Sequence, residues 1–268
     1  MKKTVEGRIS FSFFCCLTLE LGRWHNPYYE FFRASAEAEI IKPEKDMTSV
    51  SSSYFRLPVV LLSILVVVCI ATVVDPPAGR ISWLLEVGPG LAGILMLIVI
   101  YKRFPMSQMV YFCVFIHMLI LIYGGYYTYA ETPLGNWAKE VFGFSRNHYD
   151  RVGHIALGVF PAFIIREVLL RKTPLRRGGW LYFIVISVVL AVAAFWELLE
   201  WWITLFVASD IGTAFLGSQG DIWDAQWDMF LALVGAMVAL PILSRLHDRS
   251  MAQLPKAQSS LITSNDAT

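Results

Sequence analysis

Five ionisable residues in the second half of the chain have types and spacings suited to acid–base or metal chemistry. They are Asp150, His154, Glu197, Glu200 and Asp228. Asp150 and His154 are four residues apart, and Glu197 and Glu200 are three apart, so each pair would share one helix face. Two carboxylates with separated pKa values can act as general acid and base. Carboxylates can also hold a hard divalent cation. These five are the candidate catalytic residues, and the sequence admits a divalent cation without identifying one.

A second group of polar residues is close to these five in the sequence and is a candidate for binding a substrate. It comprises Arg146, Arg151, Tyr126, Asp221 and Asp224. Arginine forks bind phosphate through paired hydrogen bonds. The alternative is structural: Arg151 pairs with Asp150 or Glu197, and the other acids are solvated helix ends. Asp224 suits a helix start, where a carboxylate interacts favourably with the helix dipole.

The elements that must position these residues are long apolar runs. The chain has 268 residues, of which 56% are hydrophobic and 16% charged, whereas soluble domains are about 25% charged. A helix of about 20 apolar residues spans a bilayer, and six runs qualify: 57–74, 81–101, 109–129, 150–170, 180–200 and 224–243. The sequence therefore predicts an all-α, polytopic membrane protein with about six transmembrane helices in the lipid bilayer.

Lysine and arginine are concentrated in alternate loops and so predict an orientation. The richer segments precede the first run, join the second to the third and the fourth to the fifth, and follow the sixth. Short loops rich in Lys and Arg are cytoplasmic, which predicts that both termini are cytoplasmic. The candidate acids then lie near the extracytoplasmic edge of the bilayer. Since three helices bring acid or imidazole groups to this depth, we expect an outward-facing acidic and histidine pocket.

The chain divides into three parts by composition. Residues 47–249 are the predicted six-helix membrane domain, and the polar residues 250–268 are a predicted disordered tail. Residues 1–46 are interpreted as a cytoplasmic extension or an overlong gene model. Their apolar run at 9–19 is too short to span a membrane and lacks a following A-x-A-like cleavage site. Met47 would be a natural start.

Composition also excludes several classes of function. The formal net charge of +1 provides no basic field for nucleic acid, so no nucleic-acid partner is expected. Two of the four cysteines are adjacent and the other two lie inside apolar runs, which indicates neither a disulfide framework nor a cysteine metal site. The chain contains no Walker or GxSxG pattern.

Several long motifs resemble the YjdF-like family of bacterial inner-membrane proteins. They read G-G-x-Y-T-Y-A at 124–130, P-L-G at 133–135, S-R-N-x-Y-D-x-x-G-H at 145–154, E-L-x-E-W-W at 197–202 and F-L-G-x-Q-G-D-x-W-D-x-Q-x-D-M at 215–229. The similarity covers residues 57–249. It implies a multi-pass protein of the bacterial inner membrane with no established biochemical activity.

A more distant pattern is similar to the VanZ-like membrane proteins, some of which are linked to glycopeptide-antibiotic resistance. The matching positions are Asp150 and His154 at a helix start, Glu197 or Glu200 ending the next helix, and Asp228 with a downstream glycine, Gly235. This resemblance implies chemistry of the cell envelope without naming a substrate.

Three functions fit these observations. The first is a site that binds or acts on an envelope lipid-linked or glycan substrate at the outward-facing pocket. The second is a transporter or channel, although such proteins usually place their sites near the bilayer midplane and contain repeats, and no repeat is visible here. The third is a structural membrane partner without catalysis. The sequence predicts neither the metal nor the oligomeric state.

Overall fold

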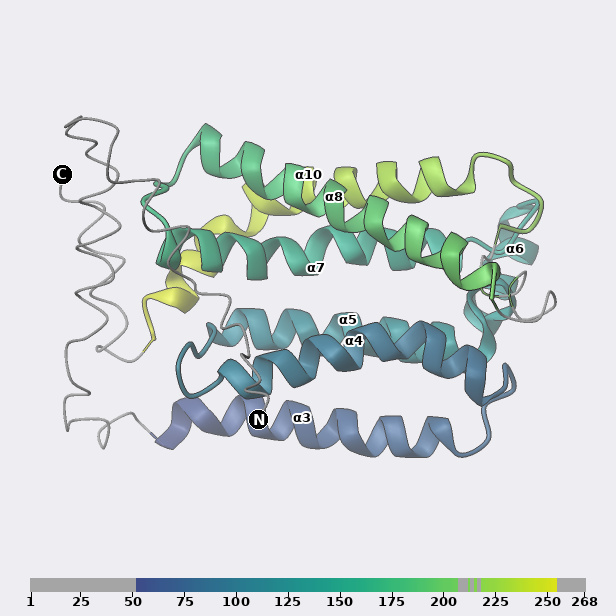
Figure 1. Ribbon diagram of the computed structural model, residues 1–268, viewed down its shortest axis with the longest axis horizontal. Helices are drawn as coiled ribbons and strands as arrows, with labels where there is room; N and C mark the ends of the chain where they lie inside the picture. The colour runs from purple at the N-terminus through teal and green to yellow at the C-terminus, as the bar shows by residue number, and fades with distance from the viewer. Residues whose placement is uncertain (1–51, 207–211, 213–214, 216–217, 255–268) are drawn as a thin grey trace, which may run out of the picture. The chain divides into compact units, whose positions relative to one another are not determined.

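The fold is a bundle of six long helices. The computed structural model describes residues 52–206, 212, 215 and 218–254, and this part of the chain contains helices and no strand. The long helices are α3 (Ser52–Val73), α4 (Arg80–Ile100), α5 (Gln108–Tyr127), α7 (Tyr149–Lys172), α8 (Gly179–Thr204) and α10 (Asp224–Met251). Figure 1 shows them running alongside one another, with neighbours in the chain running in opposite directions. The proposed extension at 1–46 and most of the proposed tail at 250–268 lie outside the described residues.

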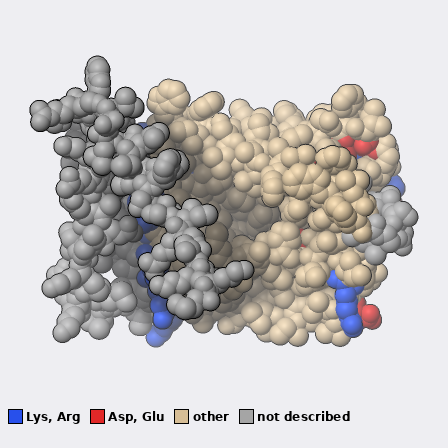
Figure 2. Space-filling model, in the orientation of Figure 1, with Lys and Arg blue, Asp and Glu red and all other residues tan. Residues whose placement is uncertain are grey.

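All six long helices are long and apolar enough to cross a membrane. Their outer faces expose large apolar side chains such as Val67, Val99 and Ile242. In Figure 2 the middle of the visible face is almost free of charged side chains. Such a surface is stable against lipid, and helices satisfy their own backbone hydrogen bonds there. The predicted all-α, polytopic architecture is confirmed.

Two short helices connect α5 to α7 at one end of the bundle, which we call the α6 end. They are η2 (Tyr129–Glu131) and α6 (Pro133–Phe142). The third predicted span was expected to reach Tyr129, but α5 ends at Tyr127 because Thr128 adopts a φ of 65°. The chain then turns inward, and the ring of Tyr129 packs against Gly124 and Gly153, where any Cβ would collide with it.

Helices α7 and α10 form the most closely packed pair in the bundle. A Cβ at Gly158 would collide with the carbonyl of Ala232, and one at Gly235 would lie 2.6 Å from the carbonyl oxygen of Ile155. Glycine therefore permits the two backbones to touch, as small residues do in membrane helices. This crossing brings His154, one turn before Gly158, close to the first turns of α10.

The sixth helix continues past its predicted end at Leu243 to Met251. His247, Ser250 and Met251 are buried, and the hydroxyl of Ser250 accepts a hydrogen bond from the backbone of Met109 at 3.0 Å. The polar composition of this segment therefore reflects buried contacts with other helices. The fifth helix also runs past its expected end, reaching Thr204.

Candidate functional site

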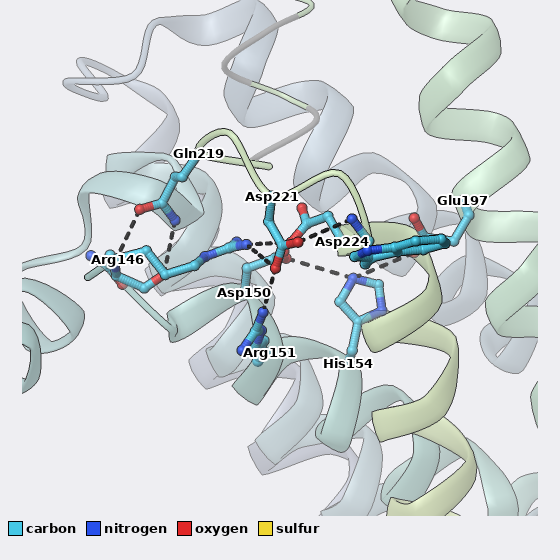
Figure 3. Close-up of polar contacts among 10 residues, drawn as sticks. Arg146, Asp150, Arg151, His154, Glu197, Gln219, Asp221 and Asp224 are labelled. Atoms are coloured by element: carbon cyan, nitrogen blue, oxygen red, sulfur yellow. Dashed lines mark hydrogen bonds and ion pairs between the residues drawn. The ribbon is translucent and has the colours of Figure 1, made fainter. Parts of the chain in front are cut away.

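Acidic side chains and one histidine from four helices gather inside the α6 end, and Figure 3 shows members from α7, α8 and the start of α10. We call this group the α6-end cluster: Glu86 from α4, Asp150 and His154 from α7, Glu197 and Glu200 from α8, and Asp224 and Asp228 from α10. Asp228 is 2% exposed and His154 5% exposed. Burying so many carboxylates costs free energy unless each one has a hydrogen-bond or ion-pair partner. The partners of each carboxylate therefore indicate its role.

His154 lies at the centre of the cluster. Its Nε2 atom is 3.6 Å from Asp150 Oδ1 and 3.7 Å from Glu197 Oε1. Its Nδ1 atom is buried without a hydrogen-bond partner among the described residues, as is Oδ1 of Asp228. The structure therefore brings together the three helix faces that the sequence places at one depth. The catalytic role of these residues stays a prediction.

Three residues of the cluster are arranged to hold a metal ion. Asp150, His154 and Asp228 each offer one ligand atom, and these atoms lie within 4.8 Å of one another. Zinc binds nitrogen and oxygen ligands at about 2.0–2.2 Å with tetrahedral geometry, so two ligands of one ion are about 3.5 Å apart. Binding would therefore draw the most widely separated of these atoms together by about 1 Å. Imidazole with carboxylates suits Zn²⁺ or Mn²⁺, and three protein ligands leave positions open for substrate or water.

The two arginines predicted to bind substrate are engaged by acids. The Nη1 atom of Arg146 lies 2.5 Å from Asp224 Oδ1 and 3.6 Å from Asp221 Oδ2. Arg151 donates to Asp221 Oδ2 at 2.8 Å, whereas the structural alternative had paired it with Asp150 or Glu197. The four residues thus form a charged rim beside the cluster, and Figure 3 shows it next to His154.

A pair of side-chain amides holds this rim in place. Gln219 Oε1 accepts from the backbone N–H of Asn147 at 3.0 Å, and Gln219 Nε2 donates to the Asn147 carbonyl at 2.8 Å. The Asn147 side chain donates to the carbonyl of Thr132 at 3.1 Å and occupies the space left by the missing Cβ of Gly135. The segment before α10 is therefore attached to the start of α7. Gln219 and Asn147 occur in the quoted motifs but were not singled out there.

A cavity of about 410 Å³ reaches the cluster from the middle of the bundle. Its polar end includes Glu86, Tyr129, His154 and Glu200, while most of its remaining lining is apolar. Tyr126, predicted to bind substrate, is not among the lining residues and packs edge-on against Tyr127 with ring centres 4.8 Å apart. Tyr129 lines the cavity instead of Tyr126, because the chain turns inward after α5.

The phenol of Tyr129 is neutral in this setting. Burial raises the pKa of Tyr129 well above its ordinary value, and the neighbouring charge of Glu86 raises it further. A neutral phenol can donate a hydrogen bond into the cavity. Tyr129 and Glu86 are therefore two residues of the site that were absent from the predicted set.

A second buried polar group lies at the opposite end of α7 and α10. We call it the Glu167 network: Arg166, Glu167, Arg171, His247 and Asp248. Glu167 accepts from Arg171 at 2.6 Å and from the Ser107 backbone at 2.8 Å, and its other oxygen lies 3.0 Å from His247 Nε2. Arg166 lies 2.7 Å from Asp248. The sequence does not reveal this network, because its basic members resemble ordinary positive residues at a cytoplasmic helix end.

Comparison with known proteins identifies the family. Residues 57–249 match the family described as "Predicted membrane protein (DUF2238)". The chain belongs to this family. It is 41% identical over 172 residues to the inner membrane protein YjdF of Escherichia coli (strain K12), which covers 64% of this chain and 82% of that relative. No solved structure matches the chain.

The family match contains every residue of the α6-end cluster and of the Glu167 network. The predicted resemblance to YjdF-like proteins and the multi-pass, inner-membrane location are confirmed. The similarity to VanZ-like proteins stays a prediction. The family description and the relative's name do not state an activity, so function must be argued from the site.

Proposed function

We propose that this inner-membrane protein binds a divalent cation through Asp150, His154 and Asp228 and acts on the phosphate-bearing head group of an envelope lipid-linked substrate. The supporting observation is that His154 Nδ1 and Asp228 Oδ1 are buried without a hydrogen-bond partner among the described residues, and that His154 and Asp150 line a cavity. More than about 90% of buried polar groups in proteins are hydrogen-bonded. A cation, or a ligand that it holds, would supply the missing partner.

The chemistry follows from the charges around the proposed cation. A bound divalent ion polarises a phosphate oxygen and lowers the pKa of a bound water. It would also offset the repulsion among Asp150, Asp228 and Glu197, which otherwise disfavours an anionic substrate. Glu197 lies beside His154 at 3.7 Å and is a carboxylate outside the three proposed ligands that can exchange a proton with a reacting water. Arg146 and Arg151 on the rim provide positive charge for the phosphate.

The proposed site faces the extracytoplasmic side. Six spans place the start of α3 and the end of α10 at the same end of the bundle, opposite the α6 end (Figure 1). That end also carries Lys102, Arg103, Arg176 and Arg177, all of which are exposed. Positive residues remain cytoplasmic. Glu140→Cys, at an exposed position in α6, and Arg176→Cys test this orientation. A membrane-impermeant maleimide applied to spheroplasts should label Glu140→Cys and not Arg176→Cys. Labelling of Arg176→Cys alone would contradict the orientation.

Metal binding is tested by thermal unfolding of the purified protein in detergent after chelation. A ligand at 100 times its Kd stabilises the folded state by about 2.7 kcal/mol, and for a chain of this size each kcal/mol raises Tm by roughly 2–4 °C. Mn²⁺ or Zn²⁺ should therefore raise the Tm of the wild type by roughly 5–10 °C. Asp228→Asn should abolish this rise.

Asp75→Asn is the matched control, since Asp75 is an exposed carboxylate in the loop between α3 and α4. It should keep the full metal response. A wild type that responds to none of Mg²⁺, Ca²⁺, Mn²⁺ and Zn²⁺ would overturn the metal site. A response that persists in Asp228→Asn would place the ion elsewhere in the chain.

A further inference from the structure

The cavity at the α6-end cluster is a cleft between helices with a graded lining. Its walls come from α4, α5, α7 and α8. At the α6 end they carry acids, His154 and Tyr129, whereas farther along they carry Met96, Leu97, Phe160 and Ile164. A ligand that fills this space must therefore be polar at one end and apolar along the rest of its length.

The length of the cleft matches one leaflet of a bilayer. Its lining runs from Glu86 to Leu97 on α4 and from Asp150 to Ile164 on α7. At ~1.5 Å per residue these stretches are about 17 Å and about 21 Å long. The hydrocarbon core of a bilayer is about 30 Å thick, so one leaflet is about 15 Å deep. The apolar part of the cleft therefore ends near the middle of the membrane.

The cleft is open at its side. Gly93, Met96 and Val192 line it and are also exposed, and no atom lies within 4 Å of the position of a Cβ on Gly93. Figure 2 shows the hollow between α8 and α4 on the uncharged middle of the visible face. At this depth the surroundings are lipid. A water-soluble ligand would gain nothing from an apolar side opening, whereas a hydrocarbon chain can pass through it without leaving an apolar environment.

From these features, and resting on the proposed function, we infer that the substrate is a phosphate-headed membrane lipid that enters sideways between α4 and α8. One hydrocarbon chain lies in the cleft, and the head group lies at the α6-end cluster. The volume of about 410 Å³ falls at the small end of the range for small-ligand sites, about 300–1,000 Å³. It suits a single chain, and any further chain would stay in the surrounding bilayer.

Gly93 lines the open side of the cleft. Because no atom lies within 4 Å of a Cβ there, Gly93→Leu adds bulk at this opening with room for its Cβ, and leucine also favours helix by roughly 0.8 kcal/mol over glycine. Gly88→Leu is the matched control. It lies on the same helix, its Cβ would be at an ordinary 3.7 Å from Leu84 Cδ1, and Gly88 is not among the lining residues.

The test uses hexadecyl phosphate carrying a diazirine near the end of its chain, bound to the protein in nanodiscs with Mn²⁺. After illumination, the attachment sites are mapped by peptide mass spectrometry. Labels on Phe160, Ile164 and Val192 are expected. Unlabelled hexadecyl phosphate should compete, while inorganic phosphate and hexadecanol at equal concentration should not. Gly93→Leu should reduce these labels at least tenfold, and Gly88→Leu should keep them.

The outcomes separate this inference from the proposed function. Wild-type labelling in Gly93→Leu, labels confined to outward-facing residues, or full competition by inorganic phosphate would overturn the lateral chain site. Labelling that is lost in Gly93→Leu but unchanged by Asp228→Asn and by chelation would uphold the chain site and overturn the proposed head-group and metal site. Loss of labelling in both variants supports both.

Discussion

The two ends of the α7–α10 pair bury similar residue types in opposite ways. The Glu167 network encloses a carboxylate that is 0% exposed, and both of its oxygens are bonded. The α6-end cluster buries Asp228 almost as deeply, yet one of its oxygens and one nitrogen of His154 have no partner among the described residues. The first arrangement fixes helices in place. The second has unfilled bonding capacity next to a cavity.

The difference comes from where the arginines lie. At the Glu167 end, Arg171 pairs with the buried Glu167, and Arg166 pairs with the half-buried Asp248. At the α6 end, Arg146 and Arg151 instead form ion pairs with Asp221 and Asp224 on the rim, as far as the described residues show. Of the inner acids, Asp150 and Glu197 lie beside His154, and Glu200 accepts from Trp196 Nε1. Burial and acidity alone do not distinguish the two groups, but the pairing of their most deeply buried carboxylates does: both oxygens of Glu167 are bonded, and Oδ1 of Asp228 has no partner among the described residues.

The largest expected effect is at the Glu167 end. Glu167→Ala removes the carboxylate that Arg171 and His247 share and leaves the buried charge of Arg171 without its ion-pair partner Glu167. Breaking a buried pair in this way costs about 3–5 kcal/mol. Thermal unfolding in detergent should show a Tm lower by roughly 6–20 °C. If the Tm fell by less than about 2 °C, the network would not be the structural anchor described here.

The next effect is at the crossing between the two clusters. Gly158→Ala places a methyl group against the carbonyl of Ala232, and overpacking of this kind costs about 1–3 kcal/mol. The helices must separate, which moves His154 away from Asp228. We expect both a lower Tm and a lost metal response. Gly93→Ala, whose Cβ would have no neighbour within 4 Å, should keep the wild-type Tm and the wild-type metal response. A metal response preserved in Gly158→Ala would show that the crossing does not position the site.

A smaller effect of opposite sign is expected for Asp228→Asn in the absence of metal. Neutralising one of several buried acids relieves repulsion, so the metal-free protein should become more stable by about 0.5–2 kcal/mol, as is common when function-related strain is removed. Unfolding in the presence of a chelator measures this. A metal-free variant that is markedly less stable than the wild type would mean that Asp228 is structural, like Glu167.

The smallest effect concerns His148, just before α7. Burial, followed by the charges of Arg151 and Arg146, lowers the pKa of His148 below its ordinary value of 6.5. The unfolded chain therefore takes up this proton at higher pH than the folded protein, so stability declines as pH falls through about 6.5. Histidine NMR, assigned with His148→Gln, should show titration below 6.5, moving upward in Arg151→Gln. Titration at or above 6.5 in the wild type would contradict the lowering of the His148 pKa by burial and by the charges of Arg151 and Arg146.

The parts of this structure that are local in sequence were predictable. Apolar runs predict the six spans, and the i,i+4 spacing of Asp150 and His154 predicts a shared helix face. Contacts between distant segments were not predictable from one sequence. The exchange of hydrogen bonds between Gln219 and Asn147 depends on how two loops meet, and the inward turn that buries Tyr129 depends on the positive φ of Thr128.

The Glu167 network also could not be predicted from the sequence. Its histidine and Asp248 lie beyond the predicted end of the sixth span, where a polar segment usually indicates solvent. Only the packing of α10 against α7 shows that His247 is completely buried. Similarly, Gly93 is one of 18 glycines, and nothing about its neighbours in the sequence shows that the space beside it is empty.

The α7–α10 pair also divides the bundle mechanically. It is clamped at three levels: the rim at one end, the glycine crossing in the middle and the Glu167 network at the other end. By contrast, among the described residues one side chain of α8 donates a hydrogen bond to another helix: the hydroxyl of Tyr182 donates to the carbonyl of Met237 at 2.8 Å. The pair therefore forms a fixed wall of the cleft, whereas α8 is held to it mainly by the apolar packing of Leu181, Val185, Val189 and Ala193. Changes in the width of the cleft would then leave the positions of Asp150, His154 and Asp228 undisturbed.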